Sequence, residues 1–254
     1  MTNRQPSFGR YFTLAYEDAV RVISRMWPAV LVVVAIIVVT GFLSRLAAGL
    51  IGTGLGKGVL DLLFGAAAAY LIAPYLMALY RSVATDEAMR NPEALRSTSA
   101  AQRFAAWSVL TAFILAAPGI LYGTFGPNVP PDQLTEDDIN AGAMLLVMGL
   151  AIAVWIFSVR ATTLMPLLAL DPERASLPAA FAQTRGHFWF IVGVLLITML
   201  PLVVGETIIT GLVVGIAGPL AAILLVPIGA AMSGVMLVTA IAVSTRLYQR
   251  FAGA

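Results

Sequence analysis

The sequence predicts an all-α polytopic membrane protein with six transmembrane helices, and three observations carry this prediction. The chain of 254 residues is 60% hydrophobic and only 11% charged, whereas a typical soluble domain is about 25% charged. Several apolar runs approach the roughly 20 residues that a helix needs to cross a bilayer. Positive charges cluster on one side of the crossings that these runs define. We therefore expect a single integral membrane domain over residues 1–254.

The first predicted element is an amphipathic helix over 8–26. Apolar side chains recur there at alternating steps of four and three, which forms one helical stripe: Phe8, Phe12, Ala15, Ala19, Val22 and Met26. A span follows without a linker, which favours a helix lying in the membrane surface. The alternative is an ordinary solvated helix packed on the protein.

The six spans are predicted at 27–43, 59–80, 104–123, 143–164, 188–205 and 222–245. Between the fourth and fifth, Asp171-Pro172-Glu173 resembles a helix start, with Asp as N-cap and Pro in the first turn. This indicates a second interfacial amphipathic helix over 172–186. The apolar linker 207–221 is too short for a further crossing, and its glycines indicate a bent or re-entrant piece.

The distribution of Lys and Arg fixes the predicted orientation. With both termini in the cytoplasm, the outside holds only Arg45 and Lys57 of the fifteen cations. The inside then holds Arg4, Arg10, Arg21, Arg25, Arg81, Arg90, Arg96, Arg103, Arg160, Arg174, Arg185, Arg246 and Arg250. Positive charge on the cytoplasmic side is the ordinary topology of membrane proteins, so an even number of crossings is expected.

A parallel internal repeat is also predicted. Residues 17–39 align with 178–200 at an offset of 161, and both are an amphipathic stretch that runs into an aromatic residue and a span. The second and sixth spans both finish on Leu-Tyr, at 79–80 and 247–248. Both copies begin and end on the cytoplasmic side, so the repeat axis would be near the membrane normal. Chance similarity of apolar segments is the alternative.

Charges within or beside the spans are the candidate functional positions, since a charge at mid-bilayer costs about 2.5–3.5 kcal/mol. Arg160 lies in a long apolar stretch, either inside the inner leaflet or at the end of span four with its side chain reaching the headgroups. The repeat offset maps Arg45 onto Glu206 (45 + 161 = 206). We therefore expect these two to face each other, helped by Lys57 and Asp61; the alternative is that each meets interfacial water separately.

Composition narrows the functional classes. The chain has no cysteine and one histidine, which excludes thiolate and multi-histidine metal sites. No Walker loop, Gly-x-Ser-x-Gly or His-Glu-x-x-His motif is present, and we expect no cofactor, no catalysis and no nucleic-acid partner. Carboxylates of the acidic loop could hold a divalent cation weakly, although a solvated loop is the simpler interpretation: Asp132, Glu136, Asp137 and Asp138.

Residues 157–189 carry a resemblance to a known group. An Arg in span four (Arg160), a Pro soon after (Pro166), a short helix and then Thr-Arg-Gly-x-Phe-Trp at 184–189, with a terminal Leu-Tyr-x-Arg at 247–250, resemble bacterial six-helix inner-membrane proteins. These include the membrane domain of glycerophosphodiester phosphodiesterases and related stand-alone proteins. The soluble phosphodiesterase domain is missing here, so the resemblance implies only a six-span fold in the bacterial cytoplasmic membrane.

The leading functional prediction is a non-catalytic scaffold, regulatory partner or lipid-contacting module. Its partners would be membrane lipids, another membrane protein or a second copy of the chain. The rival prediction is a small transporter or lipid-translocating protein, which a parallel repeat and a central polar pair would suit. The two differ in one observable: a transporter needs a polar cavity that reaches the midplane.

Overall fold

The computed structural model describes residues 8–51, 55–86, 92–125, 141–217 and 221–252. Over these ranges the regular structure is entirely helical and contains no strand. The elements are α1 (Phe8–Ile51), α2 (Leu55–Thr85), η1 (Pro92–Ser97), α3 (Ser99–Phe125), α4 (Ala141–Arg160), α5 (Leu164–Leu170), α6 (Leu177–Gln183), α7 (Phe188–Ala217) and α8 (Ala221–Ala252). Six stretches are long and apolar enough to cross a membrane, so the predicted all-α, multi-pass architecture is confirmed at this level.

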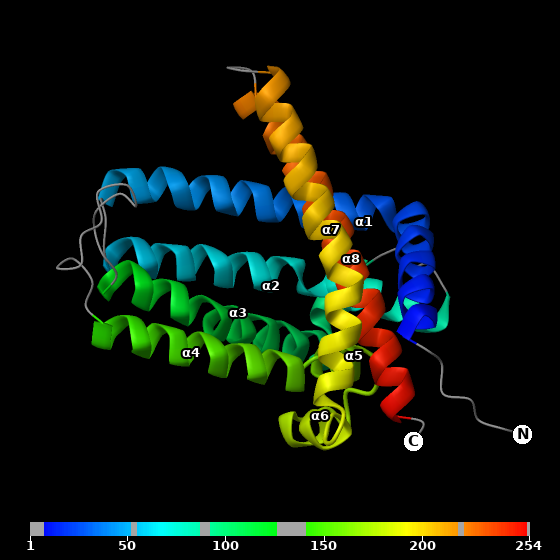
Figure 1. Cartoon of the computed structure of the whole chain (residues 1–254). Helices are drawn as coiled ribbons and strands as arrows, with labels where there is room; N and C mark the ends of the chain where they lie inside the picture. The colour runs from blue at the N-terminus through cyan, green and yellow to red at the C-terminus, as the bar shows by residue number, and fades with distance from the viewer. Residues whose placement is uncertain (1–7, 52–54, 87–91, 126–140, 218–220, 253–254) are drawn as a thin grey trace, which may run out of the picture.

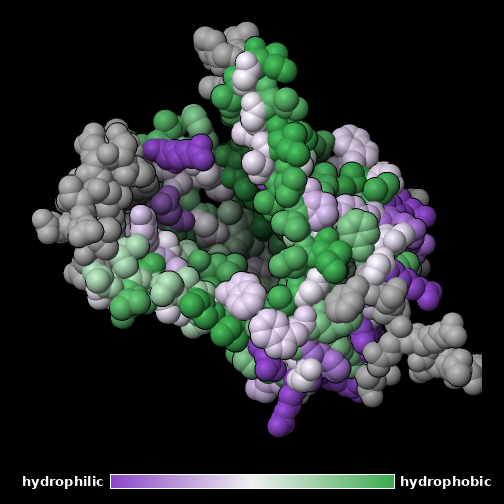
Figure 2. Space-filling view, in the orientation of Figure 1, coloured by the Kyte–Doolittle hydropathy of each residue, from purple (hydrophilic) through white to green (hydrophobic). Residues whose placement is uncertain are grey.

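Four helices form a layer that the other two long helices cross. The second part of α1 packs on α2, α2 packs on α3 and α3 packs on α4, and the α7–α8 pair crosses this group (Figure 1). The start of α1 and the end of α8 lie together, because the Arg250 guanidinium is 5.5 Å from the centre of the Tyr11 ring. We call this the terminal end and the side where α1 ends and α8 begins the opposite end. Hydrophilic surface gathers around the terminal end in Figure 2.

Helix α1 bends where the predicted surface helix meets the first span. Met26 has non-helical angles (φ −120°, ψ 28°), and Pro28 lacks the amide donor and crowds the preceding turn, which is the ordinary cause of such kinks. The apolar stripe before the bend is nevertheless buried within the protein, with Ala15 and Val22 only 1% and 2% exposed. This burial favours the alternative of a helix packed on the protein over one whose stripe faces lipid.

The connection between α4 and α7 differs from the prediction. Asp171 is the C-cap of α5 and not an N-cap, so the predicted helix start at 172 is wrong. The short helix α6 begins only at Leu177, where the Ser176 side chain accepts a hydrogen bond from the Ala179 amide and a proline occupies the first turn. Serine at the N-cap with proline in the first turn is the stronger start signal. The serine side chain bonds an amide that has no partner within the helix, and the proline removes no hydrogen bond because amides of the first turn are unpaired in any case.

The long helices extend beyond the predicted spans. Helix α1 continues to Ile51, past the predicted end at 43, and α7 continues through Ala217 instead of ending at 205. The residues 207–217 are therefore helix and not the bent piece that the glycines indicated. The charged residues Arg45 and Glu206 interrupt the two apolar runs, but a helix stops only where its backbone bonds are broken or capped.

The core of the described residues lies in the terminal half. It is built from the start of α1, the end of α2, the start of α3, the short helix α5, the start of α7 and the end of α8. Its largest fully buried side chains include Phe104, Met77, Leu79, Leu164, Leu168, Ile191, Ile241 and Leu247. Toward the opposite end, apolar side chains are exposed instead, such as Phe42 at 59% and Leu212 at 57%. Exposed apolar helix faces of this extent are typical of lipid contact.

Candidate functional site

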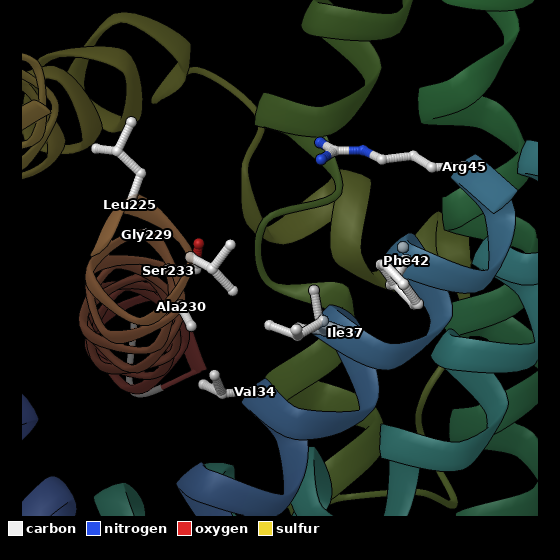
Figure 3. A pocket seen from close by; sticks show the side chains of 11 residues that line it. Val34, Ile37, Phe42, Arg45, Leu225, Gly229, Ala230 and Ser233 are labelled. Atoms are coloured by element: carbon white, nitrogen blue, oxygen red, sulfur yellow. The ribbon is translucent and has the colours of Figure 1, made fainter. Parts of the chain in front are cut away.

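A cavity of about 530 Å³ lies between α1 and α8, where the two helices diverge toward the opposite end (Figure 3). Its walls are mainly apolar, with Val34, Ile37 and Phe42 on α1 and Leu225 and Val226 on α8. The volume falls within the roughly 300–1,000 Å³ of sites that bind small molecules. Figure 2 shows the hollow, bordered by hydrophobic surface on the α7–α8 side.

The cavity closes where α1 and α8 touch. Gly234 of α8 is buried, and a Cβ built on it would lie 2.9 Å from a methyl group of Val34 and 3.5 Å from one of Val30. The absence of a side chain at Gly234 therefore allows the two backbones to approach closely, as small residues do at helix crossings in membranes. Val34 both makes this contact and lines the cavity, so the cavity begins directly beyond the crossing.

Arg45 brings a positive charge to the cavity. Its side chain points from α1 across the space toward α8 in Figure 3. Arg45 follows Pro28 by 17 residues in the same helix, which is about 26 Å at 1.5 Å per residue. The hydrocarbon core of a bilayer is about 30 Å thick, so the guanidinium is suited to the headgroup level at the opposite end.

A second cavity of about 340 Å³ adjoins the first, between α1 and α2. Ile37, Gly41 and Arg45 line both cavities, and their spacing of four residues places them on one face of α1. The α1–α2 cavity carries the polar groups Thr40, Ser44 and Asp61 in addition to Arg45. The Ser44 hydroxyl donates a hydrogen bond to the Asp61 carboxylate.

The sequence-predicted positions are only partly brought together. Arg45 and Asp61 share the α1–α2 cavity, whereas Glu206 is half-buried on α7. No ion pair joins Arg45 to Glu206 among the residues that the structure describes, and that the two residues face each other stays a prediction. Helix α7 diverges from the end of α1 in Figure 1. The side chain of Lys57 lies outside the described part of the chain, as do the four acidic-loop carboxylates.

Arg160 is the last residue of α4, and the apolar stretch long enough to cross a membrane continues beyond it to Leu170, so the place of Arg160 relative to the bilayer stays a prediction. Its guanidinium carbon is 5.8 Å from the centre of the Phe188 ring, a cation–π distance. Its carbonyl accepts a hydrogen bond of 3.0 Å from the hydroxyl of Thr184, which is fully buried. Two residues of the motif that the sequence singled out, 24 positions apart, thus join the end of α4 to the end of α6.

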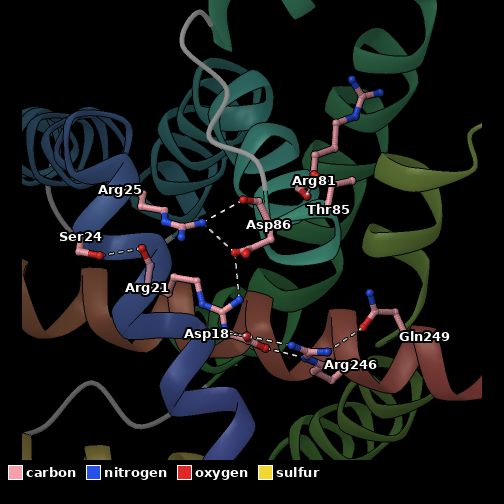
Figure 4. A network of polar contacts seen from close by, with 9 residues as sticks. All are labelled: Asp18, Arg21, Ser24, Arg25, Arg81, Thr85, Asp86, Arg246 and Gln249. Carbon is pink, nitrogen blue, oxygen red and sulfur yellow. Dashed lines mark hydrogen bonds and ion pairs between the residues drawn. The ribbon is translucent and has the colours of Figure 1, made fainter.

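The terminal end holds a charged cluster that sequence reasoning missed (Figure 4). Asp18, only 1% exposed, accepts two hydrogen bonds from Arg246, at 2.6 Å and 2.9 Å. Arg21 lies 3.0 Å from Asp18 and 2.9 Å from Asp86, and Arg25 lies 2.8 Å from Asp86. Asp18 stands three residues after Ala15 and four before Val22, which places it on the apolar stripe of the helix. A carboxylate on that stripe is the sequence feature that could have predicted a buried ion pair.

Asp86 is positioned by the end of α2. It has a left-handed backbone (φ 60°) and its amide donates to the Ser82 carbonyl at 3.0 Å, which is a helix C-terminal cap for which Asp is one of the tolerated residues. The hydrogen bond from Arg21, aided by the charge of Arg25, lowers the pKa of the Asp86 carboxyl below its usual value. The cluster therefore ties the first part of α1 to the ends of α2 and α8.

These two places offer different chemistry. The charged cluster is internally satisfied, whereas the cavities combine apolar walls with an arginine for which no carboxylate lies within ion-pair distance among the described residues. Over the same residues, no group of three or more His, Cys, Asp or Glu side chains is arranged to hold a metal ion.

No protein-family model, curated protein or solved structure matches the chain.

Proposed function

We propose that the chain is a non-catalytic integral membrane protein that acts as a lipid-contacting module, holding a membrane lipid between α1 and α8. The observation that carries this proposal is the 530 Å³ cavity with apolar walls and Arg45 among the residues that line it. Two of its lining side chains, Phe42 and Val226, are 59% and 58% exposed, so the cavity is accessible from outside the bundle. In a bilayer, the molecules that reach such a surface are lipids.

The rival function, a small transporter or lipid-translocating protein, requires a polar path through the midplane. The polar cavity residues Thr40, Ser44 and Asp61 all lie toward the opposite end. Around the α1–α8 crossing, Val33 and Val238 are fully buried, and the hydroxyl of the buried Thr239 donates to the Val235 carbonyl of its own helix. This distribution supports a site confined to one leaflet.

We place the terminal end in the cytoplasm of a bacterium, with the chain in its inner membrane. The support is the distribution of arginines, since Arg21, Arg25, Arg246 and Arg250 all gather at that end and only Arg45 and Lys57 were assigned to the other side. The parallel repeat also remains our proposal. It is supported by two helices, α1 and α7, whose spans begin directly after a break, at Met26 and at His187.

Lipid retention tests the proposal. A leucine at Gly41 fills the shared wall of both cavities, and a Cβ there meets nothing within 4 Å, so the fold is not disturbed. Gly211 on α7 is equally open and lines neither cavity, which makes G211L the matched control. Phospholipid bound after extraction and detergent exchange is measured by mass spectrometry. We expect wild type and G211L to retain lipid and G41L to lose most of it.

Equal retention by all three proteins would refute a lipid site in this cavity. The scaffold interpretation would then take its place, with the apolar surface of α7 as the face to examine for a protein partner. Thermal melting of the three proteins in the same detergent shows that each is folded, so that loss of lipid is not confused with loss of structure.

A further inference from the structure

The headgroup of the bound lipid can be inferred from the two cavities together, on the basis of the proposed function. Lipid tails are as apolar as the residues that line the larger cavity, so burying a tail there gives no discrimination among lipids. Selectivity must come from the polar groups at the headgroup level. These are Arg45, which lines both cavities, and Asp61 and Ser44, which line the smaller one.

Arg45 and Asp61 carry opposite charges in one cavity without pairing with each other. No nitrogen of Arg45 lies within 4 Å of a carboxylate oxygen among the described residues. Asp61 accepts a hydrogen bond from Ser44, and an ionised carboxylate has about four acceptor positions. Each charge therefore keeps capacity for a ligand, Arg45 for an anion and Asp61 for a donor.

The two charges, which are the charged side chains that line the cavities among the described residues, sum to zero, and this balance favours one class of lipid headgroup. The planar guanidinium fits the oxygens of a phosphate in a bidentate arrangement. A headgroup with phosphate alone would satisfy Arg45 but bring its negative charge close to Asp61. A headgroup that also carries a primary ammonium would place a donor with three N–H groups beside the carboxylate.

We infer that the α1–α2 cavity binds the headgroup of a zwitterionic, amine-bearing glycerophospholipid. The phosphate lies on Arg45, the ammonium lies on Asp61, and an acyl chain follows the α1 face through Ile37 into the α1–α8 cavity. Gly41 leaves the floor between the two cavities open, since a Cβ at that position meets no atom within 4 Å.

The test compares three probes with identical palmitoyl and oleoyl chains: phosphatidylethanolamine, phosphatidylcholine and phosphatidylglycerol. Each is titrated into the purified protein in detergent, and bound lipid is counted by native mass spectrometry. Wild type is expected to bind phosphatidylethanolamine about tenfold more tightly than the other two, the factor that one charge-assisted hydrogen bond of about 1.4 kcal/mol gives. Choline has no N–H donor, and the glycerol headgroup has no cation.

Two variants assign the contacts. D61N is expected to lose the preference for phosphatidylethanolamine while keeping its binding of phosphatidylglycerol, and this retained binding shows that the variant is folded. R45Q is expected to weaken all three lipids about tenfold, because each has a phosphate. Equal affinity of wild type for the three lipids, a preference for phosphatidylglycerol, or an unchanged preference in D61N would each overturn the inference.

The failure of this inference is distinguishable from that of the proposed function. If G41L loses lipid while G211L retains it, but wild type shows no headgroup preference, the lipid site stands and the assignment of Arg45 and Asp61 falls. If G41L binds all three probes as wild type does, the cavity is not the lipid site and both proposals fall.

Discussion

The two ends of the bundle differ in burial and in the pairing of their charged side chains. At the terminal end, five charged residues from α1, α2 and α8 satisfy one another, and the side chains around them are buried. At the opposite end, α1 and α8 separate, the apolar side chains are exposed, and Arg45 and Asp61 line a cavity without pairing. The comparison teaches that the charged and buried contacts which join the helices gather at the terminal end, while the cavities lie at the opposite end.

The largest expected effect comes from removing the buried carboxylate of the terminal cluster. D18N leaves the Arg246 guanidinium, whose side chain is 29% exposed, without its counter-charge. Breaking a buried ion pair costs about 3–5 kcal/mol, and we expect the lower value because Arg246 is partly exposed. Thermal and denaturant unfolding in detergent measure the loss.

E17Q makes the same chemical change on the neighbouring exposed residue and is expected to leave stability within about 0.5 kcal/mol of wild type. A double-mutant cycle with R246Q should show strong coupling to D18N. A D18N protein as stable as E17Q would mean that the cluster contributes nothing to holding the ends of α1 and α8 together.

The next largest effect is expected at the crossing of α1 and α8, which separates the two ends. G234A places a methyl group 2.9 Å from a methyl of Val34, and such overpacking costs about 1–3 kcal/mol. G211A meets nothing within 4 Å and should be neutral or stabilising, by up to about 1 kcal/mol of helix propensity. Melting temperatures measured side by side should therefore fall for G234A and stay the same or rise for G211A. A stabilised G234A would show that α1 and α8 do not meet closely there.

Acid should weaken the terminal end through Asp86. Its pKa is lowered in the folded protein, so it contributes stability above its unfolded value, and this contribution is lost as pH falls through the folded pKa. The melting temperature of wild type should fall between pH 6 and pH 3 by more than that of D86N, which cannot titrate. E173Q removes another exposed carboxylate and should retain the wild-type pH dependence. An identical pH dependence of D86N and wild type would contradict this role.

The smallest expected effect is at Arg160. Its contact with Phe188 is a cation–π interaction between two half-buried residues, worth about 1 kcal/mol, and the helix already ends at Arg160. R160Q should therefore lower the melting temperature only slightly and leave protein abundance in the membrane unchanged. A large fall in abundance would indicate that the guanidinium is buried in the bilayer with an essential role.

The spans were predictable from the sequence because a helix that crosses a bilayer needs a long run of apolar residues, and such a run is visible in the sequence alone. The position of the α1 bend was predictable for a local reason as well, since Trp27-Pro28 marks it in the sequence. The pairing of Asp18 with Arg246 was not, because the two residues are 228 positions apart and no local pattern connects them. Within the part of the chain that it describes, the structure shows no ion pair between Arg45 and Glu206. The repeat offset that links them matches positions along the chain, whereas the relative placement of α7 and α1 is set by helix packing.

The most direct test of the account is where a lipid touches the protein. A phosphatidylethanolamine with a photoreactive diazirine in one acyl chain is added to the purified protein, and cross-linked peptides are mapped by mass spectrometry. We predict that cross-links concentrate on residues 34–45 of α1 and 225–233 of α8. Labelling spread in proportion to exposure, with the exposed face of α4 around Leu146 and Ile152 labelled as strongly as the cavity, would contradict the claim that the opening at the opposite end is a lipid site.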